Sequence, residues 1–336
     1  MKVQAFAAHR PGLKLESFEY ELGSLNQDEV DIDIEYCGIC HSDKSMLNNE
    51  WGLTKYPIVP GHEIIGKISD IGDQVKHLKV GQYVGVGWRA RSCMICDQCL
   101  TGQHNRCLRG KDVIIGRHGG FANKVRCQSV WAFPLPSKID IKTAGPLFCG
   151  GITVFNPLIQ NNIKPTDHVA VVGIGGLGHL AIKFLNAWGC DVTAISTTPD
   201  KEDEAKKFGA HNFLNSKDNI AFKKSKNMFD MILVTSNVNL DWDTYINALR
   251  VGGKLHVVGA APEINVQVFP LISGEKSIGG SPIGSPSTIN KMLEFCSRHN
   301  IRPTVEEFPL SSVNEALTHL ESGKARYRIV LQNNFK

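Results

Sequence analysis

The sequence has no run of about 20 consecutive apolar residues, the length that a helix needs to cross a membrane. Its first residues also lack the apolar segment and cleavage site of a secretion signal. Neither sign of charge dominates, since the formal net charge is +4, and the longest basic tract is only residues 223–226. We therefore expect a cytoplasmic protein that binds neither membranes nor nucleic acids.

Cysteine, in contrast, is not scarce, because the chain of 336 residues contains 10 cysteines. Without a secretion signal, clustered thiols indicate metal ligands or catalytic groups more often than disulfides. The length predicts two domains. Residues 1–145 consist of short apolar runs separated by glycines, which favours a β-rich, barrel-like unit. After Pro146, buried apolar runs alternate with helix-like segments, which is typical of an α/β domain with a parallel sheet.

Four cysteines lie within 15 residues, at Cys93, Cys96, Cys99 and Cys107. Thiolates at this spacing can surround one tetrahedral ion and leave no open position, which describes a structural zinc site. An iron–sulfur cluster is the main alternative, but its ferredoxin motif needs a shorter last gap and a proline after the fourth cysteine. Leu108 stands there instead. Four unrelated buried thiols are the remaining alternative.

A glycine-rich motif follows the apolar run 169–172 and precedes the helix-like segment 180–185. Its members are Gly173, Ile174, Gly175, Gly176, Leu177 and Gly178. Between a buried strand and a helix, this pattern predicts a dinucleotide site, because the glycines let the backbone approach the pyrophosphate and the helix N-terminus attracts it. An ordinary tight turn is the alternative.

The next strand candidate ends in hydroxyl side chains and a lysine, at Ser196, Thr197, Thr198 and Lys201. An enzyme that binds NAD usually has an acid here to hold the ribose hydroxyls. Hydroxyls and a lysine instead suit the 2′-phosphate of NADP(H), which an acid would repel. Asp200 argues the other way, but it lies beyond the turn, beside a proline.

A third set of candidate ligands is dispersed along the chain and includes Cys37, Cys40, His62 and Cys149. Spacing alone leaves its meaning open. Cys37 and Cys40 could form a redox pair, His62 could be a core histidine, and Cys149 could be a buried thiol.

Taken in order, these motifs resemble the medium-chain zinc alcohol dehydrogenases. The run from Cys37 to Asp43, the Gly61-His62-Glu63 triplet, the four-cysteine loop and the glycine motif carry the resemblance. Within the family, the chain resembles the cinnamyl-alcohol-dehydrogenase branch and its bacterial NADPH-dependent aldehyde reductases of broad specificity. The resemblance implies a GroES-like catalytic domain of residues 1–145 and 286–336, and a Rossmann domain of residues 146–285.

The resemblance also implies a catalytic zinc site, with Cys40, His62 and Cys149 as its ligands. Glu63 can approach the metal transiently in relatives. Asp43 is expected to hydrogen-bond His62 and fix its orientation. With the four-cysteine loop, the expectation is two zinc ions per chain.

Ser42 is implied to pass a proton to or from the substrate oxygen. Many relatives have a histidine five residues after the first ligand, and here that position is Ser45, so the relay could run through His41 instead. Thr153 resembles a position that contacts the cofactor. Trp51, Trp88 and Phe148 are candidates for an apolar substrate pocket, or else for plain core.

The expected function is reduction of aldehydes to primary alcohols with NADPH by a homodimer acting on small molecules. Two alternatives stay open, namely an enzyme that oxidises alcohols or polyols with NADP, and a non-catalytic nucleotide sensor. An intact set of zinc ligands with Ser42 argues against the sensor, which needs none of them.

Overall fold

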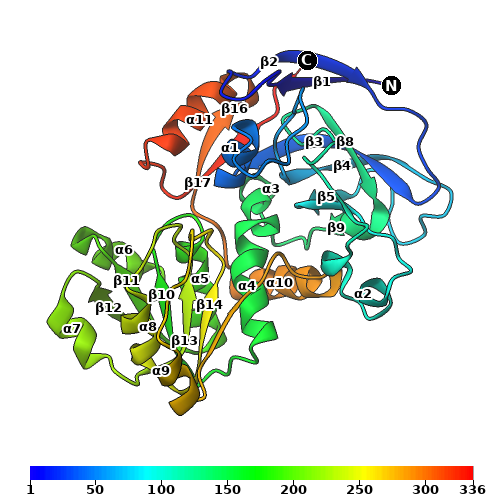
Figure 1. The fold of residues 1–336 in the computed structure, drawn as a ribbon. Coiled ribbons are helices and arrows are strands. Elements are labelled where there is room, and N and C mark those ends of the chain that lie inside the picture. Colours follow the sequence, from blue (N-terminus) through cyan, green and yellow to red (C-terminus); the bar gives the residue numbers. More distant parts are fainter. Residues whose placement is uncertain (336) are drawn as a thin grey trace. The chain divides into compact units, whose positions relative to one another are not determined.

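The computed structural model describes residues 1–335 and separates into two compact units (Figure 1). Unit 1 comprises Met1–Ile152 and Ile283–Lys336, and unit 2 comprises Thr153–Pro282. The chain thus leaves unit 1, builds unit 2, and returns. None of the helices in residues 1–335 is long and apolar enough to cross a membrane.

The main sheet of unit 1 has seven strands in the order β16-β17-β3-β4-β5-β9, with β8 paired to β3. The strands are β3 (Glu29–Ile39), β4 (Glu63–Ile71), β5 (Tyr83–Val86), β8 (Lys124–Gln128), β9 (Phe133–Pro134), β16 (Val305–Pro309) and β17 (Arg328–Gln332). Two antiparallel pairs lie apart from this sheet: β1 (Lys2–Ala7) with β2 (Glu16–Glu21), and β6 (Arg89–Arg91) with β7 (Lys111–Asp112).

Strand β3 is buried more completely than its alternating sequence predicts. Apolar side chains of Val30, Ile32 and Ile34 enter the core, as period-two alternation requires. Asp31 is nevertheless only 2% exposed, because the guanidinium of Arg126 on β8 binds both of its carboxylate oxygens, at 2.7 and 2.9 Å. A partner from another strand thus allows a carboxylate inside the sheet, which a local pattern cannot reveal.

Helices of unit 1 flank this sheet and connect its strands. They are α1 (His41–Leu47), α2 (Asp97–Leu100), α3 (Ile141–Ala144), α10 (Pro286–His299) and α11 (Val313–Glu321). Another helix, α4 (Gly150–Gln160), directly follows Cys149. Helix α10 begins as its sequence predicts, since Ser285 caps the amide of Thr288 and Pro286 occupies the first turn.

Unit 2 is built on a six-stranded parallel sheet in the order β12-β11-β10-β13-β14-β15. Its strands are β10 (His168–Val172), β11 (Asp191–Ser196), β12 (Asn212–Asn215), β13 (Phe229–Val234), β14 (Leu249–Val257) and β15 (Ser277–Gly280). Helices connect them: α5 (Gly178–Trp188), α6 (Glu202–Lys207), α7 (Asn219–Lys224), α8 (Trp242–Ala248) and α9 (Val268–Ser273). This strand order is that of doubly wound dinucleotide-binding domains, and the predicted parallel sheet is confirmed.

Each unit has its own hydrophobic core. Phe148 is fully buried in unit 1 beside Phe133, with ring centroids 6.1 Å apart, and its ring fills the space that a side chain at Gly85 would need. The suggestion that Phe148 lines a substrate pocket is therefore wrong, because the ring completes the packing under strand β5.

Candidate active site and metal centres

The four-cysteine loop brings all of its sulfur atoms around one point. The sulfur–sulfur separations are 3.6 Å for Cys96 and Cys99, 3.9 Å for Cys96 and Cys107, and 4.0 Å for Cys93 and Cys99. Four Zn–S bonds of about 2.3 Å in a tetrahedron place the sulfurs about 3.8 Å apart. The loop therefore fits a single zinc ion, whereas a cluster of several iron atoms would need wider spacing.

The dispersed candidates form a second compact group in unit 1. Ligand atoms of Cys40, His62, Glu63 and Cys149 all lie within 4.8 Å of one another. Sγ of Cys149 lies 3.2 Å from Nε2 of His62 and 3.7 Å from Sγ of Cys40. These separations match neighbouring ligands of one tetrahedral zinc ion, for which about 3.6 and 3.8 Å are expected.

The group is assembled from three separate parts of the chain. Strand β3 ends at Ile39 and delivers Cys40, strand β4 begins at Glu63 directly after His62, and Cys149 precedes α4. His62 and Glu63 are fully buried, and Cys40 is 6% exposed. A hydrogen bond from Cys149 lowers the pKa of Cys40 well below its usual value, so a thiolate, the form that binds metal, is favoured at this point.

Asp43 fixes the geometry of this group through three hydrogen bonds. Its Oδ1 accepts from Nδ1 of His62 and from the amide of Gly61, both at 2.9 Å, and its Oδ2 accepts from the amide of Cys40 at 2.9 Å. The first bond leaves Nε2 of His62 directed at the two thiols. Such a carboxylate partner sets the orientation and tautomer of a metal-binding histidine.

Arg328 is a neighbour of this group that the sequence analysis did not identify. Its guanidinium pairs with the carboxylate of fully buried Glu63, and Arg328 itself is only 5% exposed. Strand β17 carries Arg328 there by pairing antiparallel with β3, Ile329 opposite Ile39. Burial raises the pKa of Glu63 and the Arg328 charge opposes that rise. A side chain at Gly38 would collide with Oε2 of Glu63, so the glycine makes room for the pair.

Cys37 does not belong to the group. Its thiol is buried and lies 3.6 Å from the carbonyl oxygen of Gly38, and burial raises its pKa well above the usual value. The structure places Cys40 with Cys149 rather than with Cys37, which argues against a redox pair.

The two relay candidates, Ser42 and His41, and Ser45 at the position of the relatives' relay histidine occupy different surroundings on α1. Ser42 is half-buried, with Oγ 3.7 Å from Sγ of Cys40. His41 is exposed. Ser45 is buried and its hydroxyl donates to Glu50 at 2.7 Å. Of the three, only Ser42 lies against a ligand atom of the group.

The glycine motif forms the turn between β10 and α5 in unit 2. Gly173 has φ +91°, and a Cβ on Gly178 would lie 1.8 Å from the carbonyl oxygen of Gly173. Gly175, in contrast, has nothing within 4 Å of its missing Cβ. Two glycines are thus required by the turn, and the third leaves its outer side open to a ligand, as a dinucleotide loop needs.

The residues after β11 lie beside this loop. The amino group of Lys201 lies 3.2 Å from the carbonyl oxygen of Ile174 within the glycine motif. Ser196 ends the strand, and its hydroxyl accepts from the amide of Thr198 at 3.1 Å. Thr197 and Thr198 are exposed, as is Asp200. Thr153 lies on α4 and is half-buried.

Two tryptophans stand next to His62. The Trp88 ring meets the imidazole edge-on, with centroids 4.9 Å apart and planes at 80°. Trp51 packs against Trp88 at 6.1 Å and is 42% exposed. An aromatic wall therefore runs from the candidate metal group to the surface of unit 1.

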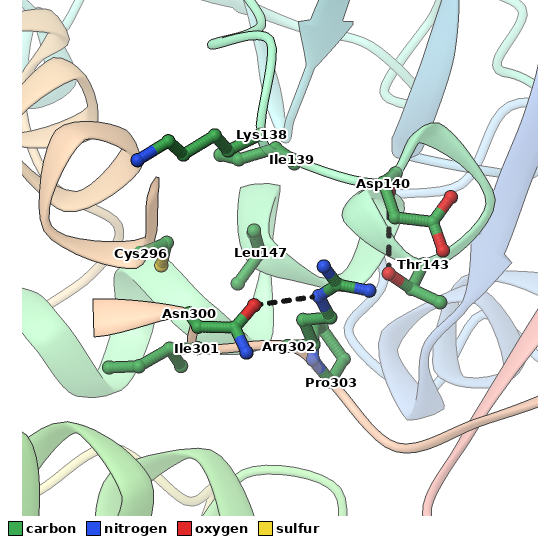
Figure 2. Close-up of a pocket in the computed structure, with 10 residues that line it drawn as sticks. All are labelled: Lys138, Ile139, Asp140, Thr143, Leu147, Cys296, Asn300, Ile301, Arg302 and Pro303. Carbon is green, nitrogen blue, oxygen red and sulfur yellow. Dashed lines mark hydrogen bonds between the residues drawn. The ribbon is translucent and has the colours of Figure 1, made fainter. Parts of the chain in front are cut away.

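Unit 1 also contains a small cavity apart from the metal ligands, and this cavity is too small to hold an aldehyde substrate (Figure 2). Its volume is about 10 Å³, the room that one water molecule needs. It is lined by Lys138, Asp140, Thr143, Cys296, Asn300 and Arg302, among others. The metal group, not this cavity, is therefore the candidate active site.

Both units match known families. Residues 26–137 match the family described as alcohol dehydrogenase GroES-like domain, and residues 176–298 match the family described as zinc-binding dehydrogenase. The aldehyde reductase AdhA of Synechocystis sp. is 49% identical over 333 residues, which cover 99% of each chain. Vomilenine reductase of Rauvolfia serpentina is 38% identical over 343 residues, covering 98% of this chain and 94% of that protein.

Solved structures agree with these matches. A cinnamyl alcohol dehydrogenase from Sorghum bicolor is 33% identical, with a TM-score of 0.93 over 99% of this chain and 98% of that one. The CAD from Helicobacter pylori complexed with NADP(H) is 29% identical, with a TM-score of 0.89 and the same coverage. The predicted combination of a GroES-like and a Rossmann domain is confirmed, and the chain belongs to the zinc-binding alcohol dehydrogenase family.

Proposed function

We propose that this oxidoreductase reduces aldehydes to primary alcohols, with NADPH as the hydride donor. The observation that carries the proposal is the buried group of Cys40, His62 and Cys149, whose three ligand atoms surround one point beside Ser42. Three protein ligands with room for a substrate oxygen are the ligand set of a catalytic rather than a structural zinc site. The name of the Synechocystis relative, an aldehyde reductase, supports this direction.

In this mechanism each residue has a separate task. When bound, zinc supplies Lewis-acid polarisation of the carbonyl oxygen, and NADPH supplies the hydride. Cys40, His62 and Cys149 hold the metal, and Asp43 keeps His62 in its ligating tautomer. The hydroxyl of Ser42 donates the proton that the product oxygen needs before the alcohol leaves, and is reprotonated from His41 or solvent.

We attribute the choice of coenzyme to the end of strand β11. Ser196, Thr197, Thr198 and Lys201 offer hydroxyls and a positive charge where NAD-binding domains usually have an acid. The amino group of Lys201 lies against the glycine loop, close to where the adenosine ribose is held in such domains. The Helicobacter pylori neighbour, solved with NADP(H), supports this choice. Thr153 is proposed as a further contact to the coenzyme.

The wall of Trp88 and Trp51 favours apolar substrates. A ring that packs edge-on against His62 excludes water from one side of the metal group and offers apolar surface to the substrate. Aromatic and medium-length aliphatic aldehydes suit such a wall better than polyols, whose hydroxyls would lose hydrogen bonds to water.

Oxidation of alcohols or polyols is the second candidate, because several relatives are named mannitol dehydrogenase. The one from Petroselinum crispum is 37% identical over 327 residues, covering 94% of this chain. The reaction is reversible in principle, so direction and substrate polarity separate the two candidates. A non-catalytic nucleotide sensor would turn over neither class.

The test is a turnover screen of the zinc-loaded protein in both directions. Benzaldehyde, butanal and hexanal are assayed with NADPH and NADH, and benzyl alcohol, hexanol and mannitol with NADP⁺ and NAD⁺. We expect aldehyde reduction with NADPH to have the largest kcat/KM. A larger kcat/KM for mannitol oxidation would support the second candidate, and no turnover at all would support the sensor. Gel filtration of the same preparation tests the proposed homodimer.

A further inference from the structure

A ligand-sized hollow lies in unit 1, lined by the N-terminal hairpin and the segment before β8. Its volume is about 320 Å³, which is within the range of small-molecule sites. The residues that matter for its chemistry are Tyr20, Ser24, Asn26, Arg117, His118 and Arg126.

This hollow is remote from the candidate metal group. Glu29, at the start of strand β3, lines the hollow, and Cys40 follows the other end of the same strand. The nine steps along the chain from Asp31, which binds Arg126, to Cys40 span about 30 Å at about 3.3 Å per residue. A ligand in the hollow would therefore not touch the metal ligands.

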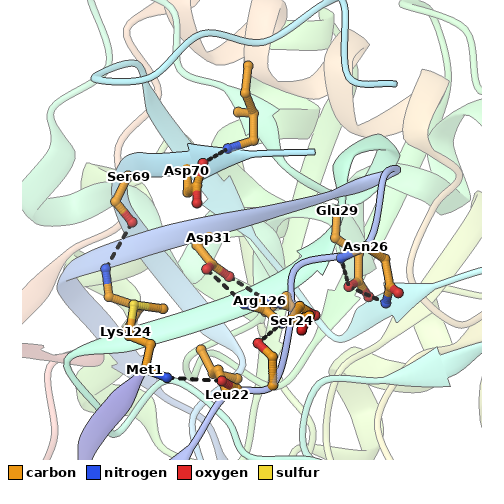
Figure 3. Close-up of polar contacts among 12 residues, drawn as sticks. Met1, Leu22, Ser24, Asn26, Glu29, Asp31, Ser69, Asp70, Lys124 and Arg126 are labelled. Atoms are coloured by element: carbon orange, nitrogen blue, oxygen red, sulfur yellow. Dashed lines mark hydrogen bonds and ion pairs between the residues drawn. The ribbon is translucent and has the colours of Figure 1, made fainter. Parts of the chain in front are cut away.

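Most charges around the hollow are already compensated. Arg126 donates to both oxygens of Asp31 and to the carbonyl oxygens of Gly23 and Ser24, at 2.9 and 2.8 Å (Figure 3). The carboxylate of Glu29 accepts from Asn26 at 2.6 Å and from Arg91 at 3.3 Å. These pairs hold the lining residues in place, and the charges of Arg126 and Glu29 are therefore largely unavailable to a ligand.

Arg117 is the exception. One of its guanidinium nitrogens donates to the carbonyl oxygen of Arg126 at 2.6 Å, which holds the side chain at the hollow. Among residues 1–335, no carboxylate lies within ion-pair distance of Arg117. The Arg117 guanidinium therefore lines the hollow without a carboxylate partner and with donors to spare, which suits the carboxylate of a small ligand.

Part of the lining is aromatic. The rings of Tyr20 and His118 lie 4.4 Å apart, and Phe18 packs edge-on against His118 at 5.6 Å. Nδ1 of His118 is buried without a hydrogen bond. Burial and the Arg117 charge lower the pKa of His118, and burial raises that of Tyr20. At neutral pH both side chains are therefore uncharged, and the Tyr20 hydroxyl keeps a proton to donate.

We propose that this hollow binds a small aromatic monocarboxylate, with the carboxylate on Arg117 and the Tyr20 hydroxyl and the ring against Tyr20 and His118. A guanidinium binds a carboxylate through two parallel hydrogen bonds. Aromatic side chains add stacking that an aliphatic acid of the same charge does not obtain. One unpaired cation matches a monoanion better than a phosphate, which carries more charge.

The test is calorimetric titration of the zinc-loaded full chain with benzoate, cyclohexanecarboxylate and inorganic phosphate. We expect benzoate to bind most tightly. Arg117→Met should weaken benzoate binding at least tenfold, and Tyr20→Phe, which keeps the ring, should weaken it by a few-fold. Arg109→Met, which removes an exposed arginine outside the hollow, is the matched control and should bind as the wild type does.

A carboxylate can also bind a catalytic metal, so inhibition of turnover by benzoate is measured in each variant. Inhibition by benzoate bound at the metal should be equal in wild type and Arg117→Met. Binding of benzoate in the hollow, measured by calorimetry, should be lost only in Arg117→Met. Unchanged benzoate binding in that variant, or tighter binding of phosphate or cyclohexanecarboxylate, would overturn the proposal. If Arg117→Met lowers the melting temperature, the proposal is judged on Tyr20→Phe instead. Benzoate affinity equal to that of wild type in Tyr20→Phe would also overturn the proposal.

Discussion

The amino group of Lys201 donates to the carbonyl oxygen of Ile174 across 3.2 Å. One hydrogen bond thus joins the residues after the second strand of unit 2 to the loop after its first strand. The lysine also lies 3.5 Å from Glu204, whose negative charge holds it at the start of α6. Its charge is therefore positioned at the glycine loop before any coenzyme arrives.

The first prediction concerns coenzyme preference. Wild type should prefer NADPH over NADH by at least about tenfold in kcat/KM, which corresponds to only about 1.4 kcal/mol. Lys201→Glu combined with Ser196→Asp should erode or invert this ratio, because two acids would repel the 2′-phosphate. Lys207→Glu, which reverses the charge of an exposed lysine farther along α6, is the control for a charge reversal on the same helix. An unchanged ratio in the double variant would show that the phosphate is recognised elsewhere.

The second prediction concerns the metals. Elemental analysis should give two zinc ions per chain. Cys149→Ser should remove one ion and abolish turnover with little change in melting temperature. Cys96→Ser should instead lower the melting temperature, because binding of a structural metal contributes directly to folding. One ion or none in carefully prepared wild type would contradict the paired sites.

Replacement of Ser42 tests proton transfer. Ser42→Ala should keep both metals and coenzyme affinity but reduce aldehyde turnover by about 10²- to 10⁴-fold, as loss of a positioned proton donor does. Ser42→Thr keeps the hydroxyl and should retain much of the rate. Ser45→Ala is the control, since its hydroxyl is occupied by Glu50. Near wild-type turnover of Ser42→Ala would mean that water delivers the proton.

Arg328 should stabilise the metal-binding unit through Glu63. Arg328→Met leaves a buried carboxylate without its partner, so it should lower the free energy of unfolding by about 3–5 kcal/mol. Adding Glu63→Gln should recover part of that loss, because the unpaired charge is then gone. Urea denaturation of the single and double variants measures both effects. Equal stability of Arg328→Met and wild type would contradict the ion pair.

His256 should make unit 2 less stable in acid. Its Nδ1 accepts from Asn161 at 3.0 Å, its Nε2 lies 2.9 Å from Oγ of Ser281, and burial lowers its pKa to about 4. Below pH 6.5 His256 is protonated in the unfolded chain but stays neutral in the folded chain. Stability attributable to His256 should therefore fall between about pH 6.5 and 4, by up to about 1.4 kcal/mol per pH unit. Melting temperatures of His256→Asn should vary less over this range than those of wild type.

The sequence was most informative where chemistry depends on neighbours along the chain. The four-cysteine loop and the glycine motif contain all of their essential residues within 15 and 6 positions, so spacing, together with the strand and helix that flank the glycines, predicts what each can bind. The alternation of strands and helices in unit 2 likewise follows from local hydrophobic patterns, and the predicted parallel sheet is present. Short strands such as β12, β15 and β16 carry too few apolar residues to be recognised in this way.

Features that depend on pairing between distant strands could not be predicted from the sequence. Arg328 and Glu63 are 265 positions apart in the sequence. They meet only because β17 pairs with β3. Asp31 is buried only because β8 brings Arg126 to it. Cys40, His62 and Cys149 could be grouped from sequence only through the family resemblance, since their spacing contains no geometric information.

The return of the chain to unit 1 also sets the order of events during synthesis. Strand β17 leaves the ribosome after all of unit 2, yet it pairs with β3, which is made before unit 2. Unit 2 is complete as a contiguous segment once residue 282 has emerged, so it can fold while synthesis continues. Unit 1 must wait for β17, and with it for Arg328. Unit 1 is therefore begun before unit 2 and completed after it.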